Sequence, residues 1–226
     1  MYGRQVDERE LNFEASGGLI HASLVMQDRE TDSYWSIMSH SAIAGPLHGT
    51  SLRELPVGVK VQWKDWVAAH PDTRILSVGG TEHIPGTNRY DSYLKSERVF
   101  RDGEVRDDRL EAKTSIYAFD LGGVPYAVPL SKVEGGAVVQ AGDRSVFVYR
   151  PAGAAIYRSS TSFVSPEGGF IRRDGRFVHE SSGATFDPAT GRFAGGDGAP
   201  DPLAGVDTFW FNWSMNRPET RLLDIR

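Results

Sequence analysis

The sequence predicts a mainly β protein with a few short helices, in which two tandem copies of a β-rich unit pack together. Three observations predict this class. Short runs rich in β-branched and aromatic residues alternate with Gly, Pro and Asp-Gly turn signals, which is typical of strands. Helical patterns are few and brief. Blocks from the first half of the 226 residues recur in the same order in the second half.

Five runs are expected to form strands, and turn residues separate them. The last run contains Asp174-Gly175, a pair that suits the positive backbone dihedrals of a two-residue hairpin turn. A chain of this length is long enough to bury a core between such strands. The five runs are residues 18–26, 114–120, 124–128, 146–149 and 169–178.

The best helix candidate covers residues 63–69. Trp63 and Trp66 stand three positions apart and therefore share a helix face. Pro71 follows the expected end of the helix and prevents it from continuing. Residues 210–216 are expected to form the matching helix of the second copy.

The helix candidates belong to the clearest repeated segment. Residues 63–76 and 210–223 are identical at six of fourteen positions without a gap, and two of the six are tryptophan. Chance is a poor explanation for this agreement, so we interpret the chain as duplicated. Three further blocks recur in the same order, pairing 46–49 with 202–205, 28–35 with 187–193, and 17–20 with 168–171.

The duplication divides the chain into three parts. Residues 1–78 are the first copy, residues 79–113 are a polar connector rich in Gly and Pro, and residues 114–226 are the second copy with its leading strands. The second copy is preceded by the strand pattern at 144–149, and the first copy has no counterpart. We therefore expect the first copy to be incomplete at its N-terminal side.

Composition excludes several classes of function for these residues. The chain contains no cysteine, so it offers no thiolate ligand and no thiol nucleophile. Its 25 basic and 30 acidic residues are mixed along the chain, which argues against a nucleic-acid-binding stripe. The sequence shows no apolar run long enough for a membrane span, and the charged segment 1–10 does not resemble a signal peptide. Localisation and oligomeric state stay open.

The first copy holds the best candidates for ligand contacts. His40 and His48 stand eight residues apart across a Gly-Pro turn, with Asp28 and Glu30 upstream. Such a set could form a histidine-carboxylate metal site, but its spacing matches no standard signature, and we predict neither a metal nor a cofactor. Trp35 joins these four as a candidate, because the second copy replaces it.

The paired tryptophans are better explained by packing. Two equivalent pairs in a duplicated helix are what a repeat needs to anchor each helix on its own sheet, although an aromatic binding platform is the alternative. The predicted structural anchors of the two copies are Trp63, Trp66, Pro71, Trp210, Trp213 and Pro218.

Several ordered motifs also resemble a known family. They are DRETDSYWS at 28–36, AIAGPLHG at 42–49, W-x-x-W-x-x-x-HPDT at 63–73, LGG-x-x-YA-x-PL at 121–130 and FWF-x-W at 209–213. Together they resemble the domain of unknown function 3179 family of bacteria and archaea, over nearly the whole chain. The family carries no established reaction.

The resemblance implies one difference from the family. Family members open the first copy with a strand that carries a Cys-Pro-x-Cys-like pair, and some members are described as selenoproteins. This sequence begins just after the place where that strand is expected, so we hypothesise that Met1 is not the original start and that a selenocysteine codon was read as a stop.

Three hypotheses of function follow. The resemblance implies thiol or selenol redox chemistry in a longer form, with a segment that this chain lacks. The second hypothesis is a ligand-binding β domain with a cleft between the copies, and the third is a metal-dependent enzyme built on histidines and carboxylates. Whether the protein is an enzyme stays open, and its partners are unknown.

Overall fold

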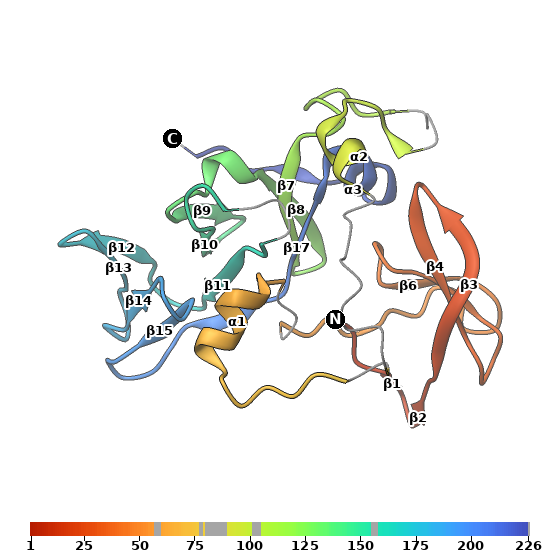
Figure 1. Ribbon diagram of the computed structural model, residues 1–226, viewed down its shortest axis with the longest axis horizontal. Helices are drawn as coiled ribbons and strands as arrows, with labels where there is room; N and C mark the ends of the chain where they lie inside the picture. The colour runs from red at the N-terminus through yellow and green to blue at the C-terminus, as the bar shows by residue number, and fades with distance from the viewer. Residues whose placement is uncertain (57–59, 77–78, 80–89, 101–104, 155–157, 226) are drawn as a thin grey trace.

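The protein is mainly β, as the sequence predicts (Figure 1). The computed structural model describes residues 1–56, 60–76, 79, 90–100, 105–154 and 158–225. Within these ranges, short antiparallel strands form four sheets of four strands and one two-stranded hairpin, and helices are few and short.

The N-terminal unit consists of a small hairpin and one four-stranded sheet, in the order β3-β4-β5-β6. His21 and Ala22 both have positive φ and form the turn between β3 and β4, so the predicted strand 18–26 is a hairpin rather than one strand. Trp35 and Leu11 are fully buried at the centre of the unit. Its strands are β1 (Gln5–Val6), β2 (Arg9–Glu10), β3 (Phe13–Ile20), β4 (Ser23–Asp28), β5 (Tyr34–Ser36) and β6 (Ser41–Ala44).

The central sheet has the order β17-β7-β8-β18 and forms the middle of the molecule. Its long hairpin turns at Gly122-Gly123, where both residues have positive φ. The edge strand β18 pairs in parallel with β8, whereas the other neighbours are antiparallel. The strands are β7 (Ser115–Leu121), β8 (Val124–Pro129), β17 (Val206–Phe209) and β18 (Arg221–Leu222).

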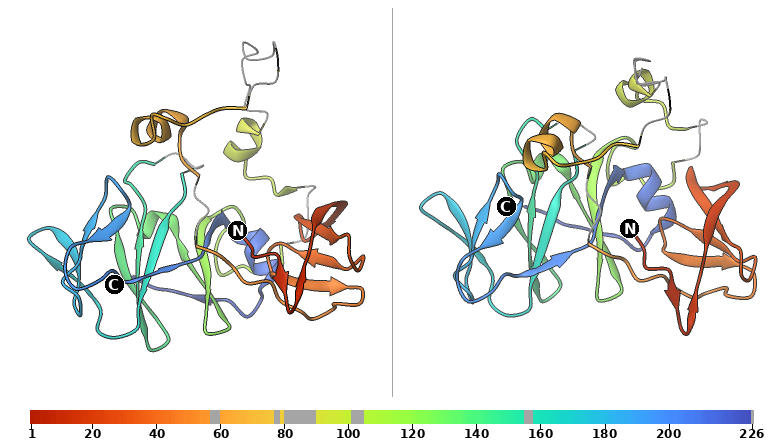
Figure 2. Two further views of the ribbon diagram at one scale, coloured as in Figure 1. Left: turned by 90° about the horizontal axis from the view of Figure 1, so that it is seen from below. Right: turned by 60° about the horizontal axis from the view of Figure 1, so that its bottom comes forward.

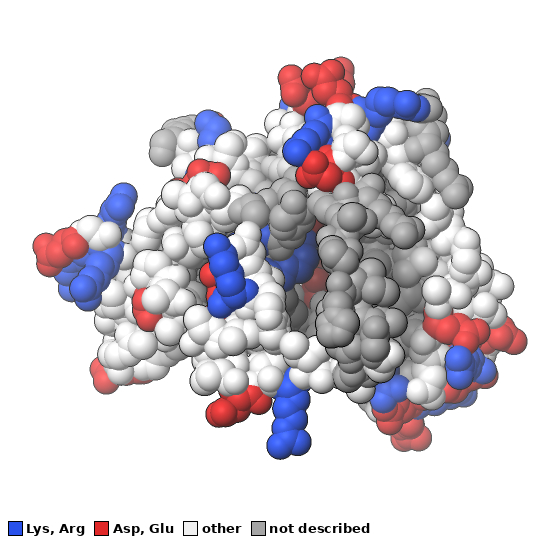
Figure 3. Space-filling view, in the orientation of Figure 1, with Lys and Arg blue, Asp and Glu red and all other residues white. Residues whose placement is uncertain are grey.

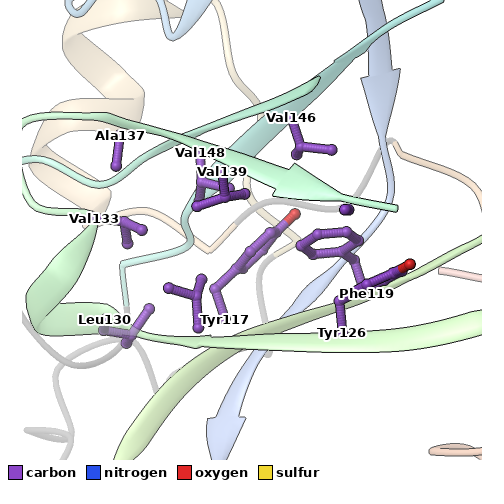
Figure 4. Packing of buried hydrophobic residues seen from close by; sticks show 11 residues of the cluster. Tyr117, Phe119, Tyr126, Leu130, Val133, Ala137, Val139, Val146 and Val148 are labelled. Carbon is purple, nitrogen blue, oxygen red and sulfur yellow. The ribbon is translucent and has the colours of Figure 1, made fainter. Parts of the chain in front are cut away.

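A third sheet, in the order β16-β11-β10-β9, packs against the central one. Apolar side chains of both sheets, among them Phe119, Tyr126 and Val146, meet in the largest core cluster (Figure 4). This burial is the main source of stability for the second half. The elements are η2 (Leu130–Lys132, a 3-10 turn), β9 (Ala137–Ala141), β10 (Arg144–Tyr149), β11 (Thr161–Ser165) and β16 (Asp201–Leu203).

The fourth sheet, in the order β12-β13-β14-β15, lies at the outer end of the second half (Figure 1). Phe147, Phe186 and Phe193 pack together beneath it, with ring centroids about 5 Å apart. The expected hairpin at Asp174-Gly175 is confirmed, because both residues have positive φ between β12 and β13. The strands are β12 (Phe170–Arg173), β13 (Arg176–His179), β14 (Thr185–Asp187) and β15 (Arg192–Ala194).

Three α-helices occur in the described ranges, α1 (Trp63–Ala69), α2 (Asp91–Lys95) and α3 (Trp210–Asn216). Helix α3 lies between the central sheet and the N-terminal unit, and Trp210 and Trp213 are fully buried there (Figures 1 and 2). Helix α1 projects from the surface and buries none of its residues. The expectation that Trp63 packs into a core is therefore wrong, since this side chain is 52% exposed.

Much of the predicted connector 79–113 lies outside the described residues. Its described part contains α2, which Lys113 holds by donating hydrogen bonds to the carbonyl oxygens of Tyr93 and Ser96. None of the helices in the described ranges is long and apolar enough to cross a bilayer. The division at 1–78, 79–113 and 114–226 stays a prediction, as does the full two-copy arrangement.

Candidate functional site

A cavity of about 420 Å³ lies between the N-terminal unit and the central sheet. Seen in the orientation of Figure 1, the middle of the molecular surface is hollowed, with charged atoms inside the hollow (Figure 3). The cavity walls come from segments far apart in the sequence, so the fold alone brings them together. The lining residues are Met1, Tyr2, Ile37, Met38, His40, Glu54, Lys60, Ser159, Ser160, Gly205, Val206, Asp207 and Trp213.

His40 is the central polar group of the cavity. It lies in the turn before β6 with a positive φ of 58°, and its backbone carbonyl accepts a hydrogen bond from the amide of Leu52. The imidazole packs against the Tyr2 ring, with centroids 5.2 Å apart. Burial, the nearby Arg217 and the Met1 amino group lower the pKa of His40 to about 4, so the ring is neutral at pH 7.

Two carboxylates flank this imidazole. Nε2 of His40 lies 3.8 Å from Oε2 of Glu54 and 3.8 Å from Oδ2 of Asp120. Glu54 is held opposite Tyr2 by an antiparallel bridge, and Asp120 stands near the end of β7. Burial, and for Glu54 also the neighbouring Asp120, raises the pKa of both carboxyl groups.

Arg217 balances one of these two charges. It caps the C-terminal end of α3, where its guanidinium donates to Asp120 Oδ1 and, 3.1 Å away, to Glu219 Oε1. Oδ2 of Asp120 is buried and has no hydrogen-bond partner among the described residues. The end of the cavity near His40 therefore has hydrogen-bond acceptor capacity that the described residues do not satisfy.

The opposite wall is fixed by a buried ionic network. Asp207 accepts hydrogen bonds from the backbone amide of Ser160 at 2.8 Å and from its hydroxyl at 2.6 Å. Arg150 lies 3.8 Å from the same carboxylate, and both side chains are almost fully buried. Because Asp207 already has these partners, its charge is largely satisfied within the protein.

Gly205 permits the close packing of this wall. A Cβ atom at position 205 would stand 2.3 Å from the Tyr117 hydroxyl oxygen and 2.8 Å from the Ala118 carbonyl oxygen. Tyr117 in turn hydrogen-bonds to Ser162 at 2.7 Å. Only glycine fits this position without moving the central sheet.

A second cavity of about 340 Å³ shares Lys60 and Asp207 with the first. Lys60 reaches this place because its backbone pairs with Ser159, through a 2.9 Å bond from the Ser159 amide and a 2.7 Å bond to the Ser159 hydroxyl. The remaining lining residues are Leu94, Ser115, Leu130, Thr208 and Phe209.

Comparison with known proteins places the chain in one family. The model of a family described as "Protein of unknown function (DUF3179)" matches residues 1–220. The chain belongs to the DUF3179 family. No curated protein and no solved structure matches it.

The structure separates the five ligand candidates that the sequence singled out in this DUF3179 protein. His40 lines the cavity, but Trp35 is fully buried in the N-terminal unit, where its indole N–H donates to Asp28 at 2.8 Å. Asp28 also accepts from the Thr31 amide and thus closes the turn between β4 and β5. Glu30 accepts hydrogen bonds from Asn12, which tie this turn to the chain before β3.

His48 is the fifth candidate, and it is not among the cavity residues. It lies in the turn after β6, where its amide donates to the Gly45 carbonyl at 3.1 Å. In the part of the DUF3179 chain that the structure describes, no group of three or more His, Asp or Glu residues is arranged to hold a metal ion.

The sequence reasoning missed most of the site. Tyr2, Glu54, Asp120 and Arg217 come from four segments far apart in the sequence, and no spacing rule connects them. One usable signal was Asp120, a carboxylate near the end of an otherwise apolar strand. A second was the position of Arg217 directly after the predicted helix 210–216, where a cationic side chain is favoured.

Proposed function

We propose that this DUF3179 protein binds a small organic molecule in the 420 Å³ cavity between the N-terminal unit and the central sheet. The ligand has an apolar body and a cationic or hydrogen-bond-donating head group that faces His40 and Glu54. The observation that carries this proposal is the neutral imidazole placed between two carboxylates, one of which has an unpartnered buried oxygen.

The size and the walls of the cavity support a small ligand. Pockets for small molecules span roughly 300–1,000 Å³, are mostly apolar and contain a few convergent polar groups. Here Ile37, Met38 and Val206 line the cavity together with the aromatic Trp213. These side chains suit an alkyl or aromatic body, because its burial releases water from apolar surface on both partners.

The charge balance supports a cationic head group. Neutral His40 contributes no charge, and Arg217 neutralises one carboxylate of the Glu54 and Asp120 pair. Among the described residues, Glu54 forms no ion pair with a Lys or Arg side chain, and the Met1 amino group only partly offsets the effect of burial on its pKa, so a bound ammonium group would reduce the penalty that remains. An anionic head group would meet the same carboxylates with repulsion.

Three probes of one shape test this proposal. Benzylammonium, benzyl alcohol and benzoate share a phenyl body and differ in the charge of the head group. We expect benzylammonium to bind about tenfold more tightly than benzyl alcohol, a difference of about 1.4 kcal/mol, and benzoate to bind least. Isothermal titration calorimetry measures the affinity of each probe. A change in the chemical shift of the His40 imidazole shows that the probe binds in the cavity.

Two variants locate the effect. Glu54→Gln should weaken benzylammonium at least fivefold and leave benzyl alcohol within twofold, whereas Glu8→Gln, on an exposed residue of the β1–β2 turn, should change neither. The proposal fails if benzoate binds as tightly as benzylammonium, or if no probe shifts the His40 signal at millimolar concentration.

The redox hypothesis from the family resemblance has no group in this chain to carry it. The 226 residues contain no cysteine, so thiol or selenol chemistry would use a residue outside them. It remains a hypothesis about a longer form, separate from the cavity proposed here.

A further inference from the structure

Residues 63–76 and residues 210–223 fold into the same local structure. Each segment begins with a seven-residue helix, α1 or α3, and each helix ends at a cap residue with nearly the same backbone angles. The cap angles are φ −135° and ψ 69° at His70, and φ −137° and ψ 67° at Arg217. In both segments the cap amide donates a 2.8 Å hydrogen bond to the first helical turn.

A side-chain hydrogen bond closes both segments in the same way. The Trp66 indole donates to the Thr73 hydroxyl at 2.9 Å, and the Trp213 indole donates to the Thr220 hydroxyl at 2.8 Å. The bond folds the chain after the helix back under the tryptophan. Each segment is therefore a helix followed by a short non-helical stretch, at 74–76 and 221–223.

In the second segment both parts are covered by one β-hairpin. Helix α3 packs its tryptophans on Ile116 and Ala118 of β7 and on Ala127 of β8. The extended stretch forms β18, which pairs in parallel with β8. The Leu223 amide adds a 2.9 Å bond to the Ala127 carbonyl.

In the first segment the corresponding surfaces are open. Trp63 is 52% exposed, Ile75 is 71% exposed and Leu76 is 90% exposed. Residues 74–76 belong to no sheet of the described structure. An ion pair from Asp65 to Arg158 tethers the helix, and Trp66 and Val67 are half-buried, so α1 is only partly covered.

We propose that residues 63–76 form a docking element for a β-hairpin presented by another polypeptide. Helix α1 would lie across the hairpin through Trp63 and Trp66, and residues 74–76 would add a parallel strand to it. Strand addition supplies main-chain hydrogen bonds, and buried tryptophans are frequent anchors of such interfaces.

The covered pair inside this protein defines the chemistry of the partner. The hairpin β7–β8 presents small apolar residues to the helix, and Asp120 on the same hairpin pairs with Arg217 at the helix end. In the first segment His70 takes the position of Arg217 and the cationic Arg74 follows four residues later, so a partner hairpin with a carboxylate near Arg74 is complementary in charge. A second copy of this chain does not offer such a hairpin, because α3 and β18 already cover β7–β8.

Hydrogen exchange of the full chain tests the proposal with a defined probe. The probe is a synthetic peptide with the sequence of residues 114–130, extended at both ends by lysines for solubility. We expect it to slow amide exchange across residues 63–76 at least tenfold. A control peptide with Ala118→Asp and Ala127→Asp should produce no protection, because it places charges on the covered face.

Variants of the full chain separate docking from other effects. Leu76→Asp should reduce the protection by the probe peptide at least tenfold, whereas Leu19→Asp, on an exposed residue of β3, should leave it unchanged. Equal protection by the charged control peptide, or no protection by the probe, would overturn the proposal. Protection that grows with protein concentration before any peptide is added would also overturn it and assign the surface to a second copy.

Discussion

Helices α1 and α3 carry the same tryptophan pair at the same spacing, end in the same cap geometry and use the same indole-to-threonine hydrogen bond. Their surroundings differ. Trp210 is fully buried beneath the central sheet, whereas its counterpart Trp63 is half exposed and α1 buries no residue. The repeated sequence thus specifies the same local backbone conformation in both places. Whether the helix packs into a core depends on the surrounding elements.

The difference has a consequence for stability. An isolated helix of seven residues is marginal in water, so α3 owes its persistence to the apolar surface that it buries. Helix α1 lacks that contribution and relies on its cap, its indole hydrogen bond and the ion pair of Asp65 with Arg158. We therefore expect paired substitutions in the two segments to have unequal effects.

The largest inequality is expected for the inner tryptophans. Trp213→Ala removes a fully buried side chain and should lower the free energy of unfolding by about 3–5 kcal/mol. Trp66→Ala removes a half-buried side chain that packs on His70, and should cost about 1 kcal/mol or less. Urea titrations followed by circular dichroism measure both, and equal costs would contradict the comparison.

Alanine substitutions at glycines in the turns that precede the two helices should also destabilise the protein more in the second segment than in the first. Gly205→Ala forces a methyl group against Tyr117 and should cost about 3 kcal/mol. Gly49→Ala, at the position that the repeat matches to it, has open space around the new methyl group and should cost about 1 kcal/mol for its positive φ alone. A Gly205→Ala protein with wild-type stability would show that the wall of the cavity is loosely packed.

The helix ends provide a comparison that depends on pH. The folded-state pKa of His40, near the α3 cap, lies at about 4 and below its unfolded value, so the stability it contributes is present above pH 6.5 and is lost as the pH falls toward 4. The raised pKa values of Glu54 and Asp120 act in the opposite direction. The measured quantity is therefore the difference in unfolding free energy between wild type and His40→Asn.

That difference should change by on the order of 2 kcal/mol between pH 7 and pH 4 in favour of the variant. His70→Asn at the α1 cap is the control, because it makes the same exchange of residue types at an exposed histidine outside the cavity. If wild type and His40→Asn run parallel over this range, His40 is not buried in its neutral form.

The smallest inequality concerns one hydrogen bond. Thr220→Val leaves the buried Trp213 indole N–H without an acceptor and should cost about 1–3 kcal/mol. Thr73→Val exposes the Trp66 indole to water, which replaces the lost acceptor, so the cost should stay below about 0.5 kcal/mol. Differential scanning calorimetry of the two variants makes the comparison.

The sequence predicts the local structure well where the signal is local. The helices at 63–69 and 210–216 and the turn at Asp174-Gly175 follow from spacing and turn residues, and the structure has all three. The predicted strand 18–26 instead contains a turn at His21 and Ala22, and neither residue type is a turn signal from which a positive φ could be predicted. The exposure of Trp63 could not be predicted from the sequence, because it depends on whether a sheet lies beneath the helix.

The candidate site was predictable only in part. His40 was singled out, but Trp35 and Asp28 bind each other inside the N-terminal unit instead of facing the cavity. Glu54, Asp120 and Arg217 join His40 through tertiary packing of β7, α3 and the N-terminal unit, and no spacing in the sequence indicates that these residues meet. Local patterns thus indicate elements, while the site depends on how distant elements meet.

The most direct test compares two amides that occupy the same position in the two segments. The His70 amide donates to the Trp66 carbonyl, and the Arg217 amide donates to the Trp213 carbonyl, both at 2.8 Å. Native-state hydrogen exchange, corrected for intrinsic rates, should find the Arg217 amide at least 100-fold slower than the His70 amide, because opening α3 requires exposure of a core. Exchange rates within about threefold of each other would contradict the claim that one copy of the motif is covered and the other is open.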